Sequence, residues 1–320
     1  MSLTAYIYIF VIIAILQTVY IAIARKAGIV SVPCRRSSHL RPTVSGGGIV
    51  FYFAVIAFYI TTGMTYTYFA IGATILAAIS FADDLHPLGV LVRMAAQIIG
   101  VTLAAMQLGI ISEMPLWATI LVIITGTGFV NACNFMDGVN GITGGYSLLT
   151  LLTLYVVNRH EPFITPSFLI IPAMAAAIFC FCNIRRHALC FAGDVGSVTV
   201  GYILLYAIGS LIDATHSIAP LVFVAVYGVD TVLTIIHRMM LRQNILQSHR
   251  MHLYQIISNE MGLGHIATAS LYIGIQALIN VGALWLPVNP VTFLAAVIAL
   301  LSVIYIFMIS RRPVINDRHG

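Results

Sequence analysis

Two adjacent carboxylates, Asp83 and Asp84, follow an apolar run in the stretch ISFADDLH, although the chain has only ten acidic residues. Side by side the two charges repel each other, and each is costly beside hydrocarbon. Either they face water with little function, or they bind a cation or transfer a proton. Arg93 follows nine residues after Asp84 and could bind a phosphate group at the same place. This stretch is the first candidate for a reactive site.

A second polar stretch, NACNFMDGVNGITGG, covers residues 131–145. Asn134, Asp137 and Asn140 supply amide and carboxylate groups that suit a nucleoside and a hard cation. A turn between helices also favours Asn, Asp and Gly. However, four glycines and four Asn or Asp residues in fifteen positions exceed what one turn requires.

Two further stretches contain glycines beside polar groups. In FAGDVGS, residues 191–197, Asp194 lies at an expected helix start, where N–H groups could meet an anion and the carboxylate could hold a metal. Asp is also a common N-cap residue, so this stretch decides little alone. In RSSHLRPTVSGGG, Arg41 and Thr43 precede three glycines that allow close approach of a ligand or of another helix.

The fifth stretch, HRMMLRQNILQSHRMHLYQ, covers residues 237–255. If it is helical throughout, His249 and His252 share one face, with Arg250 nearby. The alternative is a basic amphipathic helix that lies on anionic lipid.

The rest of the chain indicates where these stretches lie. With 60 % hydrophobic and 8 % charged residues and a mean hydropathy of +1.02, it is not an ordinary soluble domain, in which charge is nearer a quarter of the residues. Long apolar runs predict membrane helices rather than the short alternating strands of a barrel. We expect an all-α polytopic membrane protein with one domain, residues 1–320. The eleven expected spans are roughly 3–24, 46–62, 66–82, 93–112, 115–133, 142–157, 163–182, 196–212, 217–236, 266–286 and 291–310.

The distribution of positive charge predicts the orientation of these spans. Of fifteen Lys and Arg residues, only Arg159 falls on one side, so the positive-inside rule places the other side in the cytoplasm. The net charge of +5 therefore describes one membrane face and does not indicate a nucleic-acid partner. The five cysteines lie in or near the cytoplasmic half, where disulfides are not expected.

All five polar stretches would open to the cytoplasmic side. Hard oxygen ligands without a thiolate cluster favour Mg²⁺, or Mn²⁺ as a substitute, and arginines beside such a site can bind phosphates. We therefore expect phosphoryl transfer between a water-soluble substrate and a lipid phosphate. A membrane transporter is the alternative, but its ion site would lie deep in broken helices. Asp230, the only acid deep in an expected span, lies near the inner end.

In these five stretches, in order and over nearly the whole chain, the sequence resembles the polyprenyl-phosphate N-acetylhexosamine-1-phosphate transferases of glycosyltransferase family 4. The resemblance implies that UDP-N-acetylhexosamine and undecaprenyl phosphate give undecaprenyl-diphospho-sugar and UMP with Mg²⁺. Such enzymes begin O-antigen or other cell-envelope glycans at the bacterial inner membrane, with loops facing the cytoplasm, and a homodimer is plausible for the family.

The fifth stretch distinguishes branches of this family. Phospho-N-acetylmuramoyl-pentapeptide translocases of peptidoglycan synthesis usually have three consecutive histidines there, whereas this chain has HRMH. That pattern resembles the branch that uses UDP-GlcNAc-type sugars, including 6-deoxy relatives. The translocase-like activity remains the alternative within the family.

The resemblance also implies roles for individual residues. Asp194, assisted by Asn134, would be the metal ligand, and Asp83 or Asp84 would accept the proton of the lipid phosphate or steer that phosphate. His249 is the third catalytic candidate. The residues do not decide between direct attack by the lipid phosphate and a covalent Asp intermediate. We favour direct attack, because the lipid phosphate is already anionic and needs mainly positioning. The candidates for substrate binding are Asn134, Asp137, Asn140, Arg93, Arg250, His252, Arg41 and Thr43.

Overall fold

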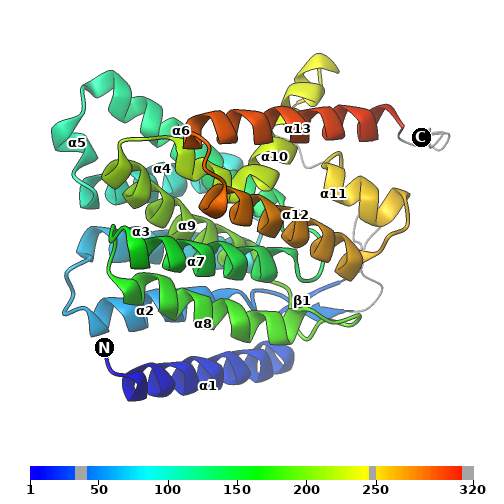
Figure 1. Ribbon diagram of the computed structural model, residues 1–320. Coiled ribbons are helices and arrows are strands. Elements are labelled where there is room, and N and C mark those ends of the chain that lie inside the picture. The colour runs from blue at the N-terminus through cyan, green and yellow to red at the C-terminus, as the bar shows by residue number, and fades with distance from the viewer. Residues whose placement is uncertain (33–41, 245–249, 312–320) are drawn as a thin grey trace.

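The computed structural model describes residues 1–32, 42–244 and 250–311, and its fold is all-α (Figure 1). The helices are α1 (Leu3–Ala27), α2 (Ile49–Thr61), α3 (Thr67–Leu85), α4 (Val90–Gln107), α5 (Ile110–Glu113), α6 (Leu116–Phe135), α7 (Ile142–His160), α8 (Pro166–Asn183), α9 (Gly193–Thr215), α10 (Ala225–Met240), α11 (Leu253–Gln255), α12 (His265–Trp285) and α13 (Pro290–Ser310). A 3₁₀ segment, η1 (Ala219–Val224), leads into α10, and a π-helical segment, η2 (Ile256–Glu260), follows α11. Two short antiparallel strands are β1 (Val30–Ser31) and β2 (Thr43–Val44).

Nine helical segments in the described ranges are long and apolar enough to cross a membrane, which makes this a multi-pass membrane protein. We expected eleven spans. The two further expected spans correspond to α2, which is apolar but has only 13 residues, and to α7. Helix α7 is less apolar because it carries hydroxyl side chains, and these are buried against other helices: Thr143, Ser147, Thr150 and Thr153. The count of eleven stays a prediction.

Helix α9 lies at the centre of the bundle. It packs against α2, α3, α6 and α7, and nearly all residues of its membrane-spanning window are buried. Glycines allow this close packing: a Cβ atom on Gly48, just before α2, would collide with the backbone of Gly196 in α9. Helix α1 lies at the edge of the bundle, where it contacts α2 and α8.

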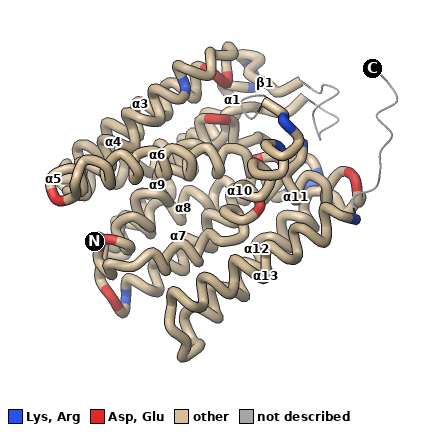
Figure 2. Tube along the Cα trace, turned by 90° about the horizontal axis from the view of Figure 1, so that it is seen from above, with Lys and Arg blue, Asp and Glu red and all other residues tan. Residues whose placement is uncertain are grey.

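The helices place all candidate loops at one end of the bundle, which we call the site end. In Figure 1, β1 and α11 lie at this end, whereas α5 lies at the opposite end. Charged residues gather at the helix ends and leave the middle of the bundle almost free of charge (Figure 2). Among the Lys and Arg residues of the described ranges, Arg159, in the last turn of α7, is the one at the opposite end.

Residues 237–255 do not form one continuous helix, so the condition under which His249 and His252 would share one helical face is not met. Helix α10 ends at Met240, Arg242 adopts a left-handed backbone with φ of 55°, and α11 begins only at Leu253. The new helix starts there because a carboxylate of α10, that of Asp230, accepts the backbone N–H groups of Leu253 and Tyr254. A tertiary contact thus overrides the local helical pattern.

Candidate active site

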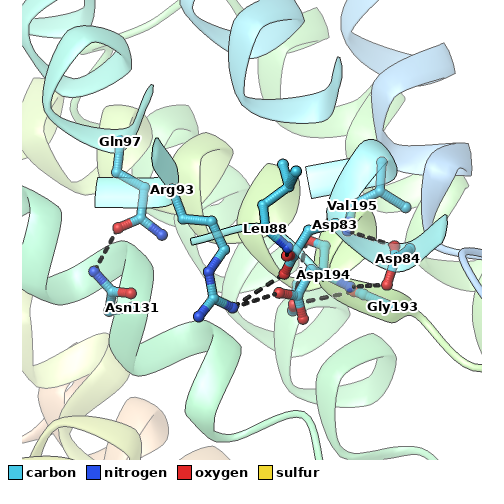
Figure 3. A network of polar contacts seen from close by, with 10 residues as sticks. Asp83, Asp84, Leu88, Arg93, Gln97, Asn131, Gly193, Asp194 and Val195 are labelled. Atoms are coloured by element: carbon cyan, nitrogen blue, oxygen red, sulfur yellow. Dashed lines mark hydrogen bonds and ion pairs between the residues drawn. The ribbon is translucent and has the colours of Figure 1, made fainter. Parts of the chain in front are cut away.

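Three helices bring Asp83, Arg93 and Asp194 together (Figure 3). Asp83 lies in the last turn of α3, Arg93 in the first turn of α4, and Asp194 in the first turn of α9. The Arg93 guanidinium lies 3.0 Å from the Asp83 carboxylate and 3.5 Å from that of Asp194. The other oxygen of Asp83 accepts the N–H group of Leu88, which holds the turn between α3 and α4 in place. One cation therefore lies between two carboxylates from distant parts of the chain.

Asp84 performs a different task from its neighbour. Its carboxylate accepts the N–H group of Asp194 at 2.9 Å and that of Val195 at 3.1 Å. These donors belong to the first turn of α9, which lacks intrahelical partners and favours an anion. Gly193 is required beside them: its φ is 68°, and a Cβ atom would lie 2.5 Å from an Asp84 oxygen. The anion at the start of α9 is therefore Asp84 itself.

The third loop extends the cluster of oxygen groups. Asn134, near the end of α6, interacts with the Asp194 carboxylate. Asp137 accepts a hydrogen bond from the hydroxyl of Thr143 at 2.5 Å. Desolvation raises the pKa of Asp137 to about 6, the Thr143 bond opposes this shift, and the charge of Asp194 adds to it. The two aspartates are thus close enough to influence each other.

Asn140 connects two loops and does not line the cavity described below. Its side-chain amide donates to the carbonyl of Arg185 at 2.9 Å, and the next N–H group, that of Gly141, donates to Asn183 at 2.6 Å. Asn183 in turn donates to the carbonyl of Cys190 at 2.9 Å. We did not single out Asn183 from the sequence, where its only signal is a polar residue at the end of an apolar run.

A cavity of about 400 Å³ opens beside the Arg93 cluster. Among the predicted site residues, Arg93, Asn134, Asp194 and His252 line it. Apolar side chains of α3, α4 and α10 form part of its wall: Leu76, Ile79, Val90, Met94 and Ile235. The cavity therefore offers charged groups and an apolar surface to one ligand.

Four polar residues that we had not assigned to the site also line this cavity: Ser80, Gln97, Asn131 and Arg238. The amide of Asn131 donates to the Gln97 oxygen at 2.6 Å (Figure 3). Gln97 lies one helical turn after Arg93, and Asn131 lies one turn before Asn134, so helical spacing was the available signal. Arg238 gave no local signal beyond its positive charge.

The first and fourth loops are joined by backbone hydrogen bonds. Val44 pairs with Cys190 and accepts the N–H group of Phe191 at 2.8 Å, while Gly47 donates to the Phe191 carbonyl at 2.8 Å. Thr43 lies in β2 next to this contact and does not line the cavity, nor does the half-buried Arg250. The remaining two site predictions, Arg41 and His249, lie outside the described residues.

The residues fit a hard divalent cation by donor type and by charge. Within the described ranges no group of three or more His, Cys, Asp or Glu residues forms a ready metal cluster. However, Asp194 lies in electrostatic range of three other carboxylates, those of Asp83, Asp84 and Asp137. Arg93 contacts two of the four carboxylates, which leaves negative charge for a cation with oxygen ligands to neutralise. Mg²⁺ or Mn²⁺ at Asp194 and Asn134 stays a prediction.

The fold and the site define a polytopic helical membrane protein with a polar cavity at one end, formed by residues from both halves of the chain. Comparison with known proteins narrows this class. The family model described as Glycosyl transferase family 4 matches residues 66–212, which include Asp83, Asp84, Arg93, Asn134 and Asp194. Over these residues the chain is similar to glycosyl transferase family 4.

Curated relatives extend the similarity beyond the matched segment. The chain is 26 % identical to a probable undecaprenyl-phosphate N-acetylglucosaminyl 1-phosphate transferase of Bacillus subtilis (strain 168), over 76 % of this chain and 73 % of the relative. It is also 26 % identical to the decaprenyl-phosphate N-acetylglucosaminephosphotransferase of Mycobacterium leprae (strain TN), over 87 % of this chain and 85 % of the relative. The undecaprenyl-phosphate alpha-N-acetylglucosaminyl 1-phosphate transferase of Escherichia coli (strain K12) is 26 % identical over 73 % of this chain and 70 % of the relative.

Proposed function

We propose that this protein transfers N-acetylhexosamine-1-phosphate from a UDP-sugar, UDP-GlcNAc or a 6-deoxy relative, to undecaprenyl phosphate. The products are undecaprenyl-diphospho-sugar and UMP. The observation that carries the proposal is the Arg93 guanidinium between Asp83 and Asp194, in a cavity that also has an apolar wall. The relatives described above are named as transferases of undecaprenyl phosphate or decaprenyl phosphate, which supports the same reaction.

In this reaction an oxygen of the lipid phosphate attacks the sugar-bearing phosphorus of the nucleotide. The bond to the bridging oxygen breaks, and that oxygen leaves with UMP. Arg93 binds phosphate oxygens and stabilises the charge of the transition state. Asp83 holds the guanidinium in place, and Asp84 holds the first turn of α9, so that Asp194 faces the cavity. A divalent cation at Asp194 and Asn134 would supply charge neutralisation and orientation of the diphosphate.

Asp83 is the better candidate for contact with the lipid phosphate. Both oxygens of Asp84 accept backbone N–H groups. Only one oxygen of Asp83 does, and its other oxygen contacts the side chain of the phosphate-binding Arg93. His252 lines the same cavity and would contact a phosphate oxygen. We further propose that the site end faces the cytoplasm of a bacterial inner membrane, that the product begins O-antigen or another envelope glycan, and that the protein acts as a homodimer.

The test is release of UMP by the purified protein in detergent or vesicles. We expect release only when a UDP-sugar, undecaprenyl phosphate and Mg²⁺ are all present, and loss of release when EDTA removes the cation. Asp194→Asn should abolish release. Asp213→Asn, an exposed carboxylate at the other end of the same helix, is the matched control and should retain it. No release with UDP-GlcNAc, UDP-GalNAc or their 6-deoxy relatives would refute the proposal.

A further inference from the structure

Asp230 is a carboxylate buried inside the helix bundle, with 3 % of its surface exposed. It accepts the N–H groups of Leu253 at 2.9 Å and Tyr254 at 3.2 Å, and the hydroxyl groups of Tyr272 at 2.7 Å and Thr234 at 3.2 Å. Burial of a carboxylate is tolerated only with such partners. Because both oxygens are occupied, Asp230 does not offer a free site for a transported cation. Its hydrogen bonds to the backbone of Leu253 and Tyr254 indicate a structural role instead.

The bonds of Asp230 fix the start of α11. The N–H groups of Leu253 and Tyr254 lie in the first turn of this helix, where no intrahelical acceptor exists. His252 is the N-cap residue, with extended backbone angles φ of −63° and ψ of 142°, and it supplies no side-chain cap. A carboxylate from another helix, α10, therefore performs the capping that the fifth loop lacks.

The same carboxylate lies beside the imidazole ring of His252. The Nδ1 atom of the ring is 3.4 Å from Asp230 Oδ1. The ring centroid is 6.0 Å from that of Phe135 and 5.9 Å from that of Tyr254, so neighbouring rings restrict it further. His252 lines the active-site cavity with Arg93, whereas Asp230 lies behind it, outside the cavity lining.

We propose that Asp230 is a positioning residue for the transfer reaction: its carboxylate fixes the start of α11 and thereby presents the imidazole of His252 to the active-site cavity. A carboxylate beside one ring nitrogen orients the ring and sets which ring nitrogen carries the proton. This inference rests on the proposed function for its reaction, but the placement of the fifth loop can be measured without any substrate.

A double-mutant cycle tests whether Asp230 acts through His252. We expect Asp230→Ala to lower kcat by roughly 10- to 100-fold, the range typical when a partner that orients a functional imidazole is lost. Asp230→Asn keeps one acceptor oxygen and should recover part of this loss. In a His252→Ala background, Asp230→Ala should lower kcat no further. Effects that multiply instead, as two independent sites would give, overturn the inference.

Backbone hydrogen exchange provides the second measurement. In Asp230→Asn the amides of Leu253 and Tyr254 should exchange faster than in the wild type, while those of α12 keep their protection. Tyr272→Phe removes one side-chain contact and leaves the two amide bonds, so it serves as the matched control with near wild-type exchange. Unchanged protection at α11 in Asp230→Asn refutes the positioning role. A wild type that releases no UMP refutes the proposed function alone, and the exchange result then decides the inference.

Discussion

Replacement of Asp84 should destabilise the protein far more than replacement of its neighbour Asp83. In Asp84→Ala the N–H groups of Asp194 and Val195, at the start of the central helix α9, lose their acceptor. In Asp83→Asn an oxygen remains for the N–H group of Leu88, and only the contact with the half-exposed Arg93 is weakened. Two adjacent residues of the same type therefore have distinguishable tasks.

The expected magnitudes follow from these contacts. Each buried donor left without a partner lowers the free energy of unfolding by about 1–3 kcal/mol. Asp84→Ala should therefore lower the free energy of unfolding by about 4 kcal/mol, and Asp84→Asn by about 2 kcal/mol, because one acceptor oxygen remains. Asp83→Asn loses only a partly exposed ion pair, so it should lower the free energy of unfolding by about 0–1 kcal/mol.

Buried cysteines supply the probe for this comparison. Cys133 and Cys190 are free and buried, so a thiol-reactive dye reports unfolding as the detergent-solubilised protein is heated at one fixed rate. At roughly 2–4 °C per kcal/mol, Asp84→Ala should lower Tm by on the order of 10 °C. Asp83→Asn should lower it by about 2 °C or less while still reducing UMP release. Equal shifts for Asp84→Ala and Asp83→Asn, or a wild-type Tm for Asp84→Ala, would refute the division of tasks.

Three further predictions concern packing, a hydrogen bond and pH. Gly48→Ala should lower Tm or prevent folding, because its Cβ atom would collide with the backbone of α9, whereas Gly274→Ala, with open space around it, should leave Tm unchanged or slightly higher. Asn131→Leu should lower the free energy of unfolding by about 1–3 kcal/mol, and adding Gln97→Leu should lower it less than two independent changes would, as thermal unfolding of the three variants can show. The pKa of Asp137 is raised from 3.8 to about 6. In EDTA the contribution of Asp137 to the stability of the folded state is therefore full below about pH 4 and is lost as the pH rises through 6. Asp137→Asn should abolish this part of the pH dependence of Tm, and an unchanged profile would contradict the raised pKa.

The sequence predicted the gathering of polar loops at one end for a physical reason. Spans that alternate in direction return every second loop to the same side, and the Lys and Arg residues marked that side. The sequence could not show which carboxylate of the Asp83–Asp84 pair contacts Arg93 beside the cavity. Adjacent residues on a helix point about 100° apart, so the answer depends on the rotation of α3 within the bundle.

Other features depend on contacts between distant segments. Arg238 and Gln97 joined the site because α4 and α10 face the same cavity, which no local pattern indicates. The start of α11 at Leu253 was not predicted because helical spacing gives no sign of the bond between Asp230 and Leu253. The low hydropathy of α7 has the same origin, since its hydroxyl groups meet other helices instead of lipid.

The short helix α2 has a consequence for the membrane around it. Thirteen residues extend only about 20 Å, roughly 10 Å less than the hydrocarbon layer of a bilayer. The loop before α2 bonds through Gly47 and Gly48 to the fourth loop, and this internal pairing allows polar backbone at such depth. We expect water and headgroups to reach inward beside these loops, so that the bilayer is thinner there. Under the proposed function, the phosphate of the acceptor lipid would then reach Arg93 while its isoprenoid chain stays in hydrocarbon, without the lipid leaving the membrane.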